Sequence, residues 1–368
     1  MDGYHLCFVD SLRTWGGAEV WILDTARRLH DAGYRVSVIA QPGAELLRRA
    51  RAADLATAAI PIRFDGAPWT VARLARRFAR DRVSAVVANL TKDLKAAAVA
   101  GRLVGVPAIF ASRESDFPLK DKIYYRWYFN RLSSGVIVNS EATRRTVLAS
   151  APWLAAERVH LLYKGVDTRR FSPAASPPPR PPGSAVVVGF AGQLIPRKGL
   201  VDLQAAWDIL QRTSAAPPRL RLAGQGPLAD DLARWRAALP RPADVELLGH
   251  REDMVSFYRD IDILVLPSYS EGFGLAAAEA AACAVPVIAT QASSLPEIVL
   301  HNRTGLLVPP GQPEALAAAV SVLGDDPDRR HDLGRAGRRH VQESFAQEIW
   351  LRKLLDLTGA RARADNLC

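Results

Sequence analysis

The chain has 368 residues and a mass of 40.0 kDa, and its 49% apolar and 23% charged residues are typical of globular proteins. At roughly 150 residues per domain this length predicts two domains, and the composition excludes a wholly disordered chain. The net charge of +10 is uneven, because residues 1–175 hold 27 basic and 16 acidic residues whereas the remainder holds 21 and 22. The first half therefore carries +11, and we expect it to face an anionic partner: nucleic acid, a membrane surface or a phosphorylated acceptor.

Short apolar runs alternate with a helical pattern through the first half of the chain. Residues 18–32 have the apolar spacing of a helix, which Gly33 ends. Strands that alternate with helices predict a parallel, doubly wound α/β sheet. The expected strands are residues 5–9, 35–40, 83–88, 108–111 and 135–138.

Two segments of the first half concentrate its positive charge. In one, arginines recur on a single helix face and apolar residues on another. In the other, basic residues interleave with aromatic ones, a combination that suits a membrane interface. A solvated basic face beside ordinary core aromatics is the alternative for both. The residues concerned are Arg73, Arg76, Arg77 and Arg80 in the first segment, and Lys120, Lys122, Tyr124, Tyr125, Arg126, Trp127, Tyr128, Phe129 and Arg131 in the second.

A Pro-rich stretch separates the two halves. Residues 177–183 are all Pro or Gly apart from Arg180, and so many fixed φ angles and missing donors exclude a helix or a central strand. We predict Rossmann-like domains over residues 1–172 and 185–343, a linker over 173–184, and a C-terminal helix within 344–368. Whether that helix crosses back to the first domain is left open. The strands expected in the second domain are residues 185–189, 220–223, 245–248, 263–266, 285–289 and 305–308.

The first loop of interest in the second domain follows its first strand. Residues 192–199 begin with Gly192 and contain the adjacent cations Arg197 and Lys198. Ligands of open α/β sheets bind at the carboxyl ends of the strands, where an Arg fork and a Lys point charge can neutralise a diphosphate. A polar loop with two surface cations is the alternative interpretation.

The second loop, residues 268–275, precedes an Ala-rich helix expected over residues 275–283. Gly272 and Gly274 let backbone N–H groups approach a ligand closely, and the helix start adds the positive end of a dipole. An anionic phosphate suits such a site, although a tight turn that requires glycine would explain the same residues.

Two glutamates, Glu271 and Glu279, bracket this helix start. Eight helical residues rise about 12 Å, whereas hydrolase carboxylate pairs lie roughly 5 to 9.5 Å apart, which argues against a general acid and base. We therefore expect contacts with different parts of one extended ligand. A carboxylate that accepts two vicinal hydroxyls is the natural role for Glu279, with Glu271 nearer the reacting sugar.

Metal, disulfide and membrane-spanning features are not expected. Asp260 and Asp262 resemble an Asp-x-Asp metal site but lie at a helix-to-strand junction, and the seven histidines have no metal spacing. The three cysteines, Cys7, Cys283 and Cys368, are far apart and favour a reducing cytoplasm. No basic segment precedes the first apolar run, so no signal peptide is expected. No apolar run approaches the roughly 20 residues of a membrane helix.

Together these runs resemble the retaining, nucleotide-sugar-dependent glycosyltransferases of family 4, which have two Rossmann-like domains facing a central cleft, the GT-B fold. The resemblance covers nearly the whole chain and is specific for the family but not for the substrate. The matching runs are residues 15–19 (WGGAE), 197–199 (RKG), 224–227 (GQGP), 248–250 (LGH), 267–279 with its Glu-x₇-Glu pair, and 302–308 (NRTGLLV).

The resemblance implies a role for each matching position. Arg197 and Lys198 would bind the donor diphosphate in the loop that Gly192 opens, Glu279 the ribose, and Glu271 the donor sugar. The remaining positions would line the donor site: the amides of Phe273, Gly274 and Leu275 beside the phosphates, Leu248 to His250 beside the nucleobase, and Gly17 from the other domain.

The resemblance also implies transfer with retention and without a metal or cofactor, the leaving diphosphate being neutralised by cations. The donor would be UDP- or GDP-linked. The expected acceptor is a lipid-linked molecule or a growing polysaccharide at the inner membrane face. The protein is expected in the cytoplasm, and its peripheral association with that membrane is one hypothesis. A nucleotide-sugar epimerase and a non-enzymatic anionic-surface binder are the alternatives.

One position departs from the family pattern. Many members carry a histidine after the strand that is expected to end near Ala111, whereas this chain has Ser112, Arg113 and Glu114. Arg113 would replace the histidine or contact an anionic acceptor, so Arg113 and Glu114 are candidate acceptor-side residues. The departure puts in doubt which sugar is bound.

Overall fold

The computed structural model describes residues 4–63, 67–175, 184–214 and 216–360. Contacts between residues divide the chain into two compact units. Unit 1 comprises residues 1–165 and 348–368, and unit 2 comprises residues 166–347. The helix near the C-terminus, α14 (Gln347–Thr358), therefore folds almost entirely with the first half of the chain.

This division corrects the expected domain boundary at residue 172. Residues 166–172 belong to unit 2 because Val166 pairs with the C-terminal end of that unit. Val166 N–H donates to Phe345 C=O (2.8 Å), and Gln347 N–H donates to Val166 C=O (3.0 Å). The ring of Phe171 also packs on Tyr258, 6.0 Å between centroids. Of the expected linker 173–184, residues 176–183 lie outside the described residues.

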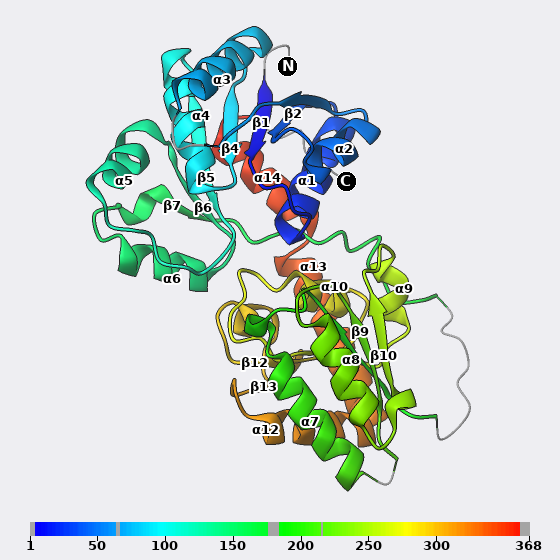
Figure 1. The fold of residues 1–368 in the computed structure, drawn as a ribbon. Helices are drawn as coiled ribbons and strands as arrows, with labels where there is room; N and C mark the ends of the chain where they lie inside the picture. Colours follow the sequence, from blue (N-terminus) through cyan, green and yellow to red (C-terminus); the bar gives the residue numbers. More distant parts are fainter. Residues whose placement is uncertain (1–3, 64–66, 176–183, 215, 361–368) are drawn as a thin grey trace. The chain divides into compact units, whose positions relative to one another are not determined.

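Unit 1 is built on a seven-stranded parallel sheet in the order β3-β2-β1-β4-β5-β6-β7 (Figure 1). All the expected strands of this half form, and two unexpected edge strands, β3 and β7, close the sheet on both sides. The strands are β1 (His5–Asp10), β2 (Arg35–Ala40), β3 (Ala56–Ala59), β4 (Ala85–Ala88), β5 (Ala108–Arg113), β6 (Gly135–Val138) and β7 (Val159–Leu161).

Helices cover both faces of this sheet. Successive residues of β1 point to opposite faces, and each face packs against helices in a hydrophobic core of its own. Leu6 and Phe8 pack with α1, α2 and α14, where Trp21 and Trp350 meet edge to face at 4.6 Å between centroids. Cys7 and Val9 pack with α3, α4 and the segment around α5. The remaining helices are α1 (Gly17–Asp31), α2 (Glu45–Ala52), α3 (Pro68–Asp81), α4 (Thr91–Leu103), α5 (Ile123–Trp127), the π-helical turn η1 (Tyr128–Leu132), α6 (Glu141–Ser150) and the 3₁₀ turn η2 (Ala156–Arg158).

Unit 2 contains a six-stranded parallel sheet in the order β10-β9-β8-β11-β12-β13. Its strands lie within two residues of those expected. They are β8 (Val187–Ala191), β9 (Arg219–Ala223), β10 (Val245–Gly249), β11 (Ile263–Leu266), β12 (Val287–Thr290) and β13 (Gly305–Val308).

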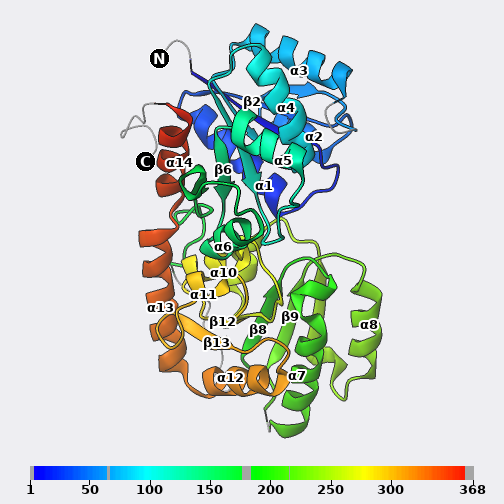
Figure 2. The same cartoon turned by 90° about the vertical axis from the view of Figure 1, so that its left-hand side faces the viewer.

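The helices of unit 2 pack in pairs, α7 beside α12 and α10 beside α13 (Figure 2). The Ala-rich helix α10 (Leu275–Ala282) is almost fully buried, and the small side chains let α13 and the sheet approach it closely. The others are η3 (Pro196–Lys198), α7 (Leu200–Thr213), α8 (Ala229–Ala238), η4 (Pro242–Asp244), α9 (Met254–Arg259), α11 (Leu295–Ile298), α12 (Pro313–Asp325) and α13 (Pro327–Ser344).

Candidate functional site

The strand order of unit 2 reverses between β8 and β11, and ligands of open α/β sheets bind at the carboxyl ends of the strands beside such a reversal. The loops after β8, β9 and β10 are linked there. Gly192 N–H donates to Ala223 C=O (3.0 Å), and Gly224 N–H donates to Gly249 C=O (2.8 Å). Leu248, half-buried, and His250, exposed, thus lie on the same edge as Gly192.

An ion pair spans the reversal point. Lys198 Nζ, after β8, lies 2.5 Å from Glu271 Oε1, after β11, and Ser268 Oγ donates to the same oxygen at 2.9 Å. The two side chains are only 11% and 8% exposed. The structure therefore brings together two residues that the sequence placed in separate loops, and their charges compensate each other in a largely dry position.

Arg197 links the same two loops through the backbone. Its guanidinium donates to Ser270 C=O (3.1 Å), and its own carbonyl accepts from Tyr269 N–H (2.9 Å). The approach requires glycine at 199, because φ there is +66° and a Cβ would lie 1.9 Å from Pro267 O. The guanidinium is half-buried, so it remains accessible at the carboxyl edge.

The start of α10 completes this edge. Gly274 precedes the helix with φ +91°, and no side chain caps it within the described residues. The buried Ser294 hydroxyl donates to Phe273 C=O (2.9 Å) and fixes the turn. Because first-turn amides have no partner inside a helix, those of Leu275 and its neighbours are suited to an anion.

Glu279 lies one helical turn inside α10 and has a different partner from Glu271. The hydroxyl of Tyr258, a fully buried side chain, donates to Glu279 Oε2 at 2.9 Å. Burial and the neighbouring Glu279 carboxylate raise the pKa of Tyr258 well above its usual value, so this group stays a donor. The expected 12 Å helical rise between the glutamates was wrong, because the helix begins at Leu275 and Glu271 lies in the preceding loop.

In unit 1, Gly17 opens α1 after the first strand. It is exposed, and a Cβ added there would meet nothing within 4 Å. Nothing in the described fold around it therefore requires glycine. Its absence of a side chain leaves the start of α1 open to a ligand.

Buried carboxyl groups lie beside that helix start, where the strand order of unit 1 reverses between β1 and β4. Asp93 accepts from Ser11 N–H and Leu90 N–H (both 3.1 Å), which joins the loops after β1 and β4. Asp10 and Glu19 are both buried, and one oxygen of each carboxyl has no hydrogen-bond partner among the described residues.

The pKa values of all three carboxyl groups are raised. Burial, then the neighbouring Asp10, raises the pKa of Glu19 to about 7. Burial raises the pKa of Asp93 to about 7 and also raises that of Asp10. Asp10 and Asp93 were not among the predicted site residues. Their signals in the sequence are an acidic residue that ends an apolar strand and an acidic residue in the first turn of a helix.

The two candidate acceptor-side residues follow β5. Glu114 pairs with Lys164, a buried lysine that was not predicted, and accepts from Ser112 Oγ at 2.5 Å. Lys164 also lies over the Trp21 ring, 4.8 Å from its centroid. Arg113 is half-buried and donates to Phe117 C=O at 2.5 Å, and burial lowers the pKa of its guanidinium. The structure thus makes Glu114 part of a buried network, whereas Arg113 is half-buried and bonded to the backbone of the following loop.

Other polar clusters have local explanations. Asp262 accepts from Val187 N–H (2.8 Å), and Asp260 lies 3.9 Å from Arg221. Among the described residues, no group of three or more His, Cys, Asp or Glu side chains is placed to hold a metal ion. No described helix is both long enough and apolar enough to span a bilayer.

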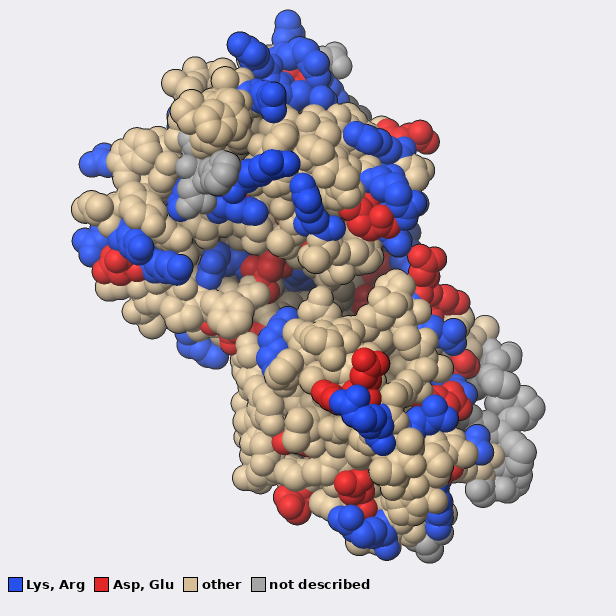
Figure 3. Space-filling view, viewed as in Figure 1, with Lys and Arg blue, Asp and Glu red and all other residues tan. Residues whose placement is uncertain are grey.

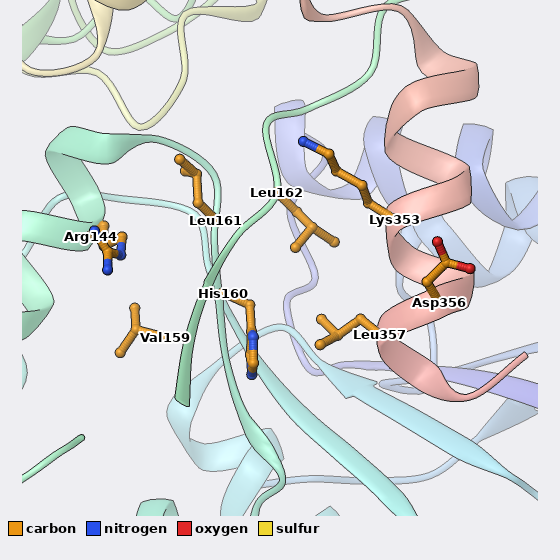
Figure 4. A pocket seen from close by; sticks show the side chains of 8 residues that line it. All are labelled: Arg144, Val159, His160, Leu161, Leu162, Lys353, Asp356 and Leu357. Carbon is orange, nitrogen blue, oxygen red and sulfur yellow. The ribbon is translucent and has the colours of Figure 1, made fainter. Parts of the chain in front are cut away.

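A pocket of about 530 Å³ lies in unit 1, and none of the predicted site residues lines it. Leu162, after β7, and Leu357, on α14, line it from facing sides, with Lys353 and Asp356 on the same helix (Figure 4). Its other lining residues are Arg144, Val159, His160 and Leu161.

Comparison with known proteins agrees with this architecture. The model of the family described as glycosyl transferases group 1 matches residues 173–340, and that of glycosyltransferase family 4 matches residues 15–170. A glycosyltransferase from Rickettsia africae has a TM-score of 0.85 at 18% identity, over 97% of this chain and 98% of that one. The Anabaena protein HepE in complex with UDP has a TM-score of 0.82 at 20% identity, over 96% and 99% of the two chains.

Curated relatives include the D-inositol 3-phosphate glycosyltransferases of Saccharomonospora viridis, 33% identical over 55% of this chain and 50% of that protein, and of Rhodococcus erythropolis, 35% identical over 52% and 46%. The chain thus spans about half the length of the curated relatives it matches. The two family models together account for both units, and the chain belongs to glycosyltransferase family 4 with the GT-B fold.

Proposed function

We propose that the chain transfers a sugar, with retention, from a nucleotide-diphosphate sugar to a lipid-linked or polysaccharide acceptor in cell-surface glycan synthesis. One observation carries the proposal: Arg197, the Lys198–Glu271 pair and the uncapped start of α10 converge on one edge of the unit 2 sheet. Two cations and helix amides suit a diphosphate. UDP is the first candidate nucleotide, since a neighbour of the same fold binds it.

In this proposal the cations act on the leaving group. Arg197 and Lys198 neutralise the charge that develops on the diphosphate as the bond between the sugar anomeric carbon and the phosphate oxygen breaks. An ammonium has three N–H donors, so Lys198 contacts phosphate while it remains paired with Glu271. Cations in these positions would make a bound metal unnecessary for transfer.

The glutamates orient the donor. Glu279, held by the Tyr258 hydroxyl, accepts the ribose hydroxyls, and Glu271 contacts the sugar. The acceptor oxygen attacks the anomeric carbon from the face that the diphosphate leaves, and its proton passes to the departing phosphate oxygen. Attack and departure on one face retain the configuration.

The acceptor is proposed from the charge of unit 1. Unit 1 holds 29 basic and 18 acidic residues, whereas unit 2 holds 19 and 20. The relatives named above are D-inositol 3-phosphate glycosyltransferases, so a phosphorylated acceptor also agrees with this surplus. We place the reaction in the cytoplasm, at the inner membrane face.

The test is transfer by the purified chain. Nucleotide sugars that raise its melting temperature are incubated with phosphorylated and lipid-linked acceptors, and products are identified by mass spectrometry and anomeric NMR. Arg197→Gln should lower kcat/KM more than tenfold, since a charge-assisted contact contributes about 1.5–3 kcal/mol.

Arg219→Gln is the matched control, because Arg219 is exposed at the amino end of β9, on the opposite edge of the same sheet. Equal activity of the two variants would refute the site. A product formed from donor alone, with its sugar epimerised, would refute transfer.

A further inference from the structure

The two basic segments of unit 1 differ in the exposure of the apolar side chains beside their cations. On α3 the apolar residues Val71, Leu74 and Phe78 are buried beneath the arginine face, and a single large apolar side chain, Trp69 in the first turn, is exposed. In residues 117–131 large apolar side chains are themselves exposed: Phe117 by 59%, Ile123 by 80% and Trp127 by 50%. The first segment is therefore an ordinary solvated helix face, and the second requires another explanation.

The second segment is firmly held in the fold, so its exposed side chains are not a consequence of loose packing. Tyr125 and Phe129, four residues apart, point into the core and stack with centroids 6.0 Å apart. Leu119 is also buried. On the other side of the short α5–η1 stretch, Ile123, Tyr124 and Trp127 face solvent, and Figure 1 shows α5 at the periphery of unit 1.

Cations surround this apolar group. Arg126 is paired with Asp121 at 3.0 Å, whereas Lys120, Lys122 and Arg131 are exposed and have no ion pair within the described part of the chain. In Figure 3, Lys and Arg atoms flank uncharged surface over the part of unit 1 that α5 occupies in Figure 1. Isolated exposed apolar residues are ordinary, but a cluster of them marks an interaction site.

The composition distinguishes between two kinds of partner. Protein–protein interfaces are enriched in aromatics but depleted in Lys. Aromatic rings with Lys and Arg beside them match a bilayer surface, where the rings lie at headgroup depth and the cations attract anionic lipid. We infer that residues 117–131, named here the α5 surface, dock unit 1 on an anionic phospholipid membrane.

Docking there has a consequence for the β5 edge. Arg113, at the carboxyl end of β5, donates to the carbonyl of Phe117, the first residue of the α5 surface. A membrane-bound α5 surface therefore holds Arg113 close to the lipid headgroups, where the head of a lipid-linked acceptor would lie. The inference goes beyond the proposed reaction and does not depend on it, because lipid binding is measured without a sugar donor.

The test is co-sedimentation of the full chain with vesicles of phosphatidylcholine alone or mixed with phosphatidylglycerol, at low and high salt. Lys120→Gln/Lys122→Gln should weaken binding to the anionic vesicles about 30-fold, which corresponds to about 1 kcal/mol per cation. Ile123→Ser/Trp127→Ser should weaken it at least about tenfold through lost apolar burial.

Matched control variants remove exposed cations or exposed apolar side chains that lie outside the α5 surface. Arg73→Gln/Arg76→Gln removes two exposed charges from α3, and Leu103→Ser/Val201→Ser removes apolar side chains that are 71% and 66% exposed. These variants should bind nearly as wild type. The inference is overturned if controls and α5-surface variants lose binding equally, if none loses binding, or if the chain binds RNA but neither kind of vesicle.

Discussion

The ion pair between Lys198 and Glu271 gives the sharpest prediction for unit 2. Lys198→Met keeps the length of the side chain but leaves Glu271, only 8% exposed, without its cation. Breaking a buried pair by removing one partner costs about 3–5 kcal/mol. Ser268 Oγ still donates to the carboxylate at 2.9 Å. We therefore expect the free energy of unfolding to fall by about 3 kcal/mol, near the lower end of that range.

A second substitution separates the charge effect from packing. In Lys198→Met/Glu271→Met the stranded carboxylate is gone, so stability should return to within about 1–2 kcal/mol of wild type. The surface pair Arg234–Asp231, with side chains 72% and 55% exposed, is the matched control, and Arg234→Met should cost less than about 1 kcal/mol.

Hydrogen exchange of β11 and α10 amides in increasing urea measures these values for unit 2 alone. Both Lys198 variants should also bind nucleoside diphosphate more than tenfold less tightly. If Lys198→Met were as stable as wild type, the pair would not be buried as described, and if its diphosphate affinity were unchanged, Lys198 would have no role in phosphate binding.

Three further results are expected. Tyr258→Phe removes the hydrogen bond to Glu279, so KM for the donor should rise about tenfold or more with kcat little changed; an unaltered KM would remove Glu279 from ribose binding. Gly17→Ala should melt as wild type, since its Cβ meets no atom within 4 Å, yet lose at least tenfold in kcat/KM, and full activity would show that no ligand approaches that helix start. Burial and Asp10 raise the pKa of Glu19 from 4.5 to about 7, so the folded state holds a proton that the unfolded chain has released, and stability falls as pH rises through that interval, by up to about 1.4 kcal/mol per unit. Glu19→Gln should reduce this slope in urea titrations of unit 1, while Asp93 keeps its own contribution, and an unchanged slope would contradict the raised pKa of Glu19.

The sequence predicted the architecture where strands are buried on both faces. Residues 263–266 are continuously apolar and residues 36–40 are apolar apart from the buried Ser37, and both runs form inner strands with the expected bounds. The two missed strands lie at sheet edges: β3 is a half-exposed Ala-Thr-Ala-Ala, and β7 has three residues, so neither has a distinctive apolar run. The boundary after Gly165 was missed because the pairing of Val166 with Phe345 joins residues far apart in the chain.

The candidate site was predictable only where a local motif carries the chemistry. Arg197, Lys198, Glu271 and Gly274 all occupy short loops after expected strands, and the structure gathers them on one edge. Residues that contact the site from other elements of the fold belong to no local sequence motif. Tyr258, from α9, and Lys164, after β7, reach Glu279 and Glu114 through tertiary packing alone.

The central claim is that a nucleoside diphosphate binds at the carboxyl edge of unit 2 through Arg197 and its neighbours. Isothermal titration of UDP, GDP and the corresponding nucleosides into wild type, Arg197→Gln and Arg219→Gln tests it most directly. We predict that one diphosphate binds far more tightly than its nucleoside, and that only Arg197→Gln narrows this difference, by tenfold or more. A diphosphate affinity that Arg197→Gln leaves intact would contradict the claim.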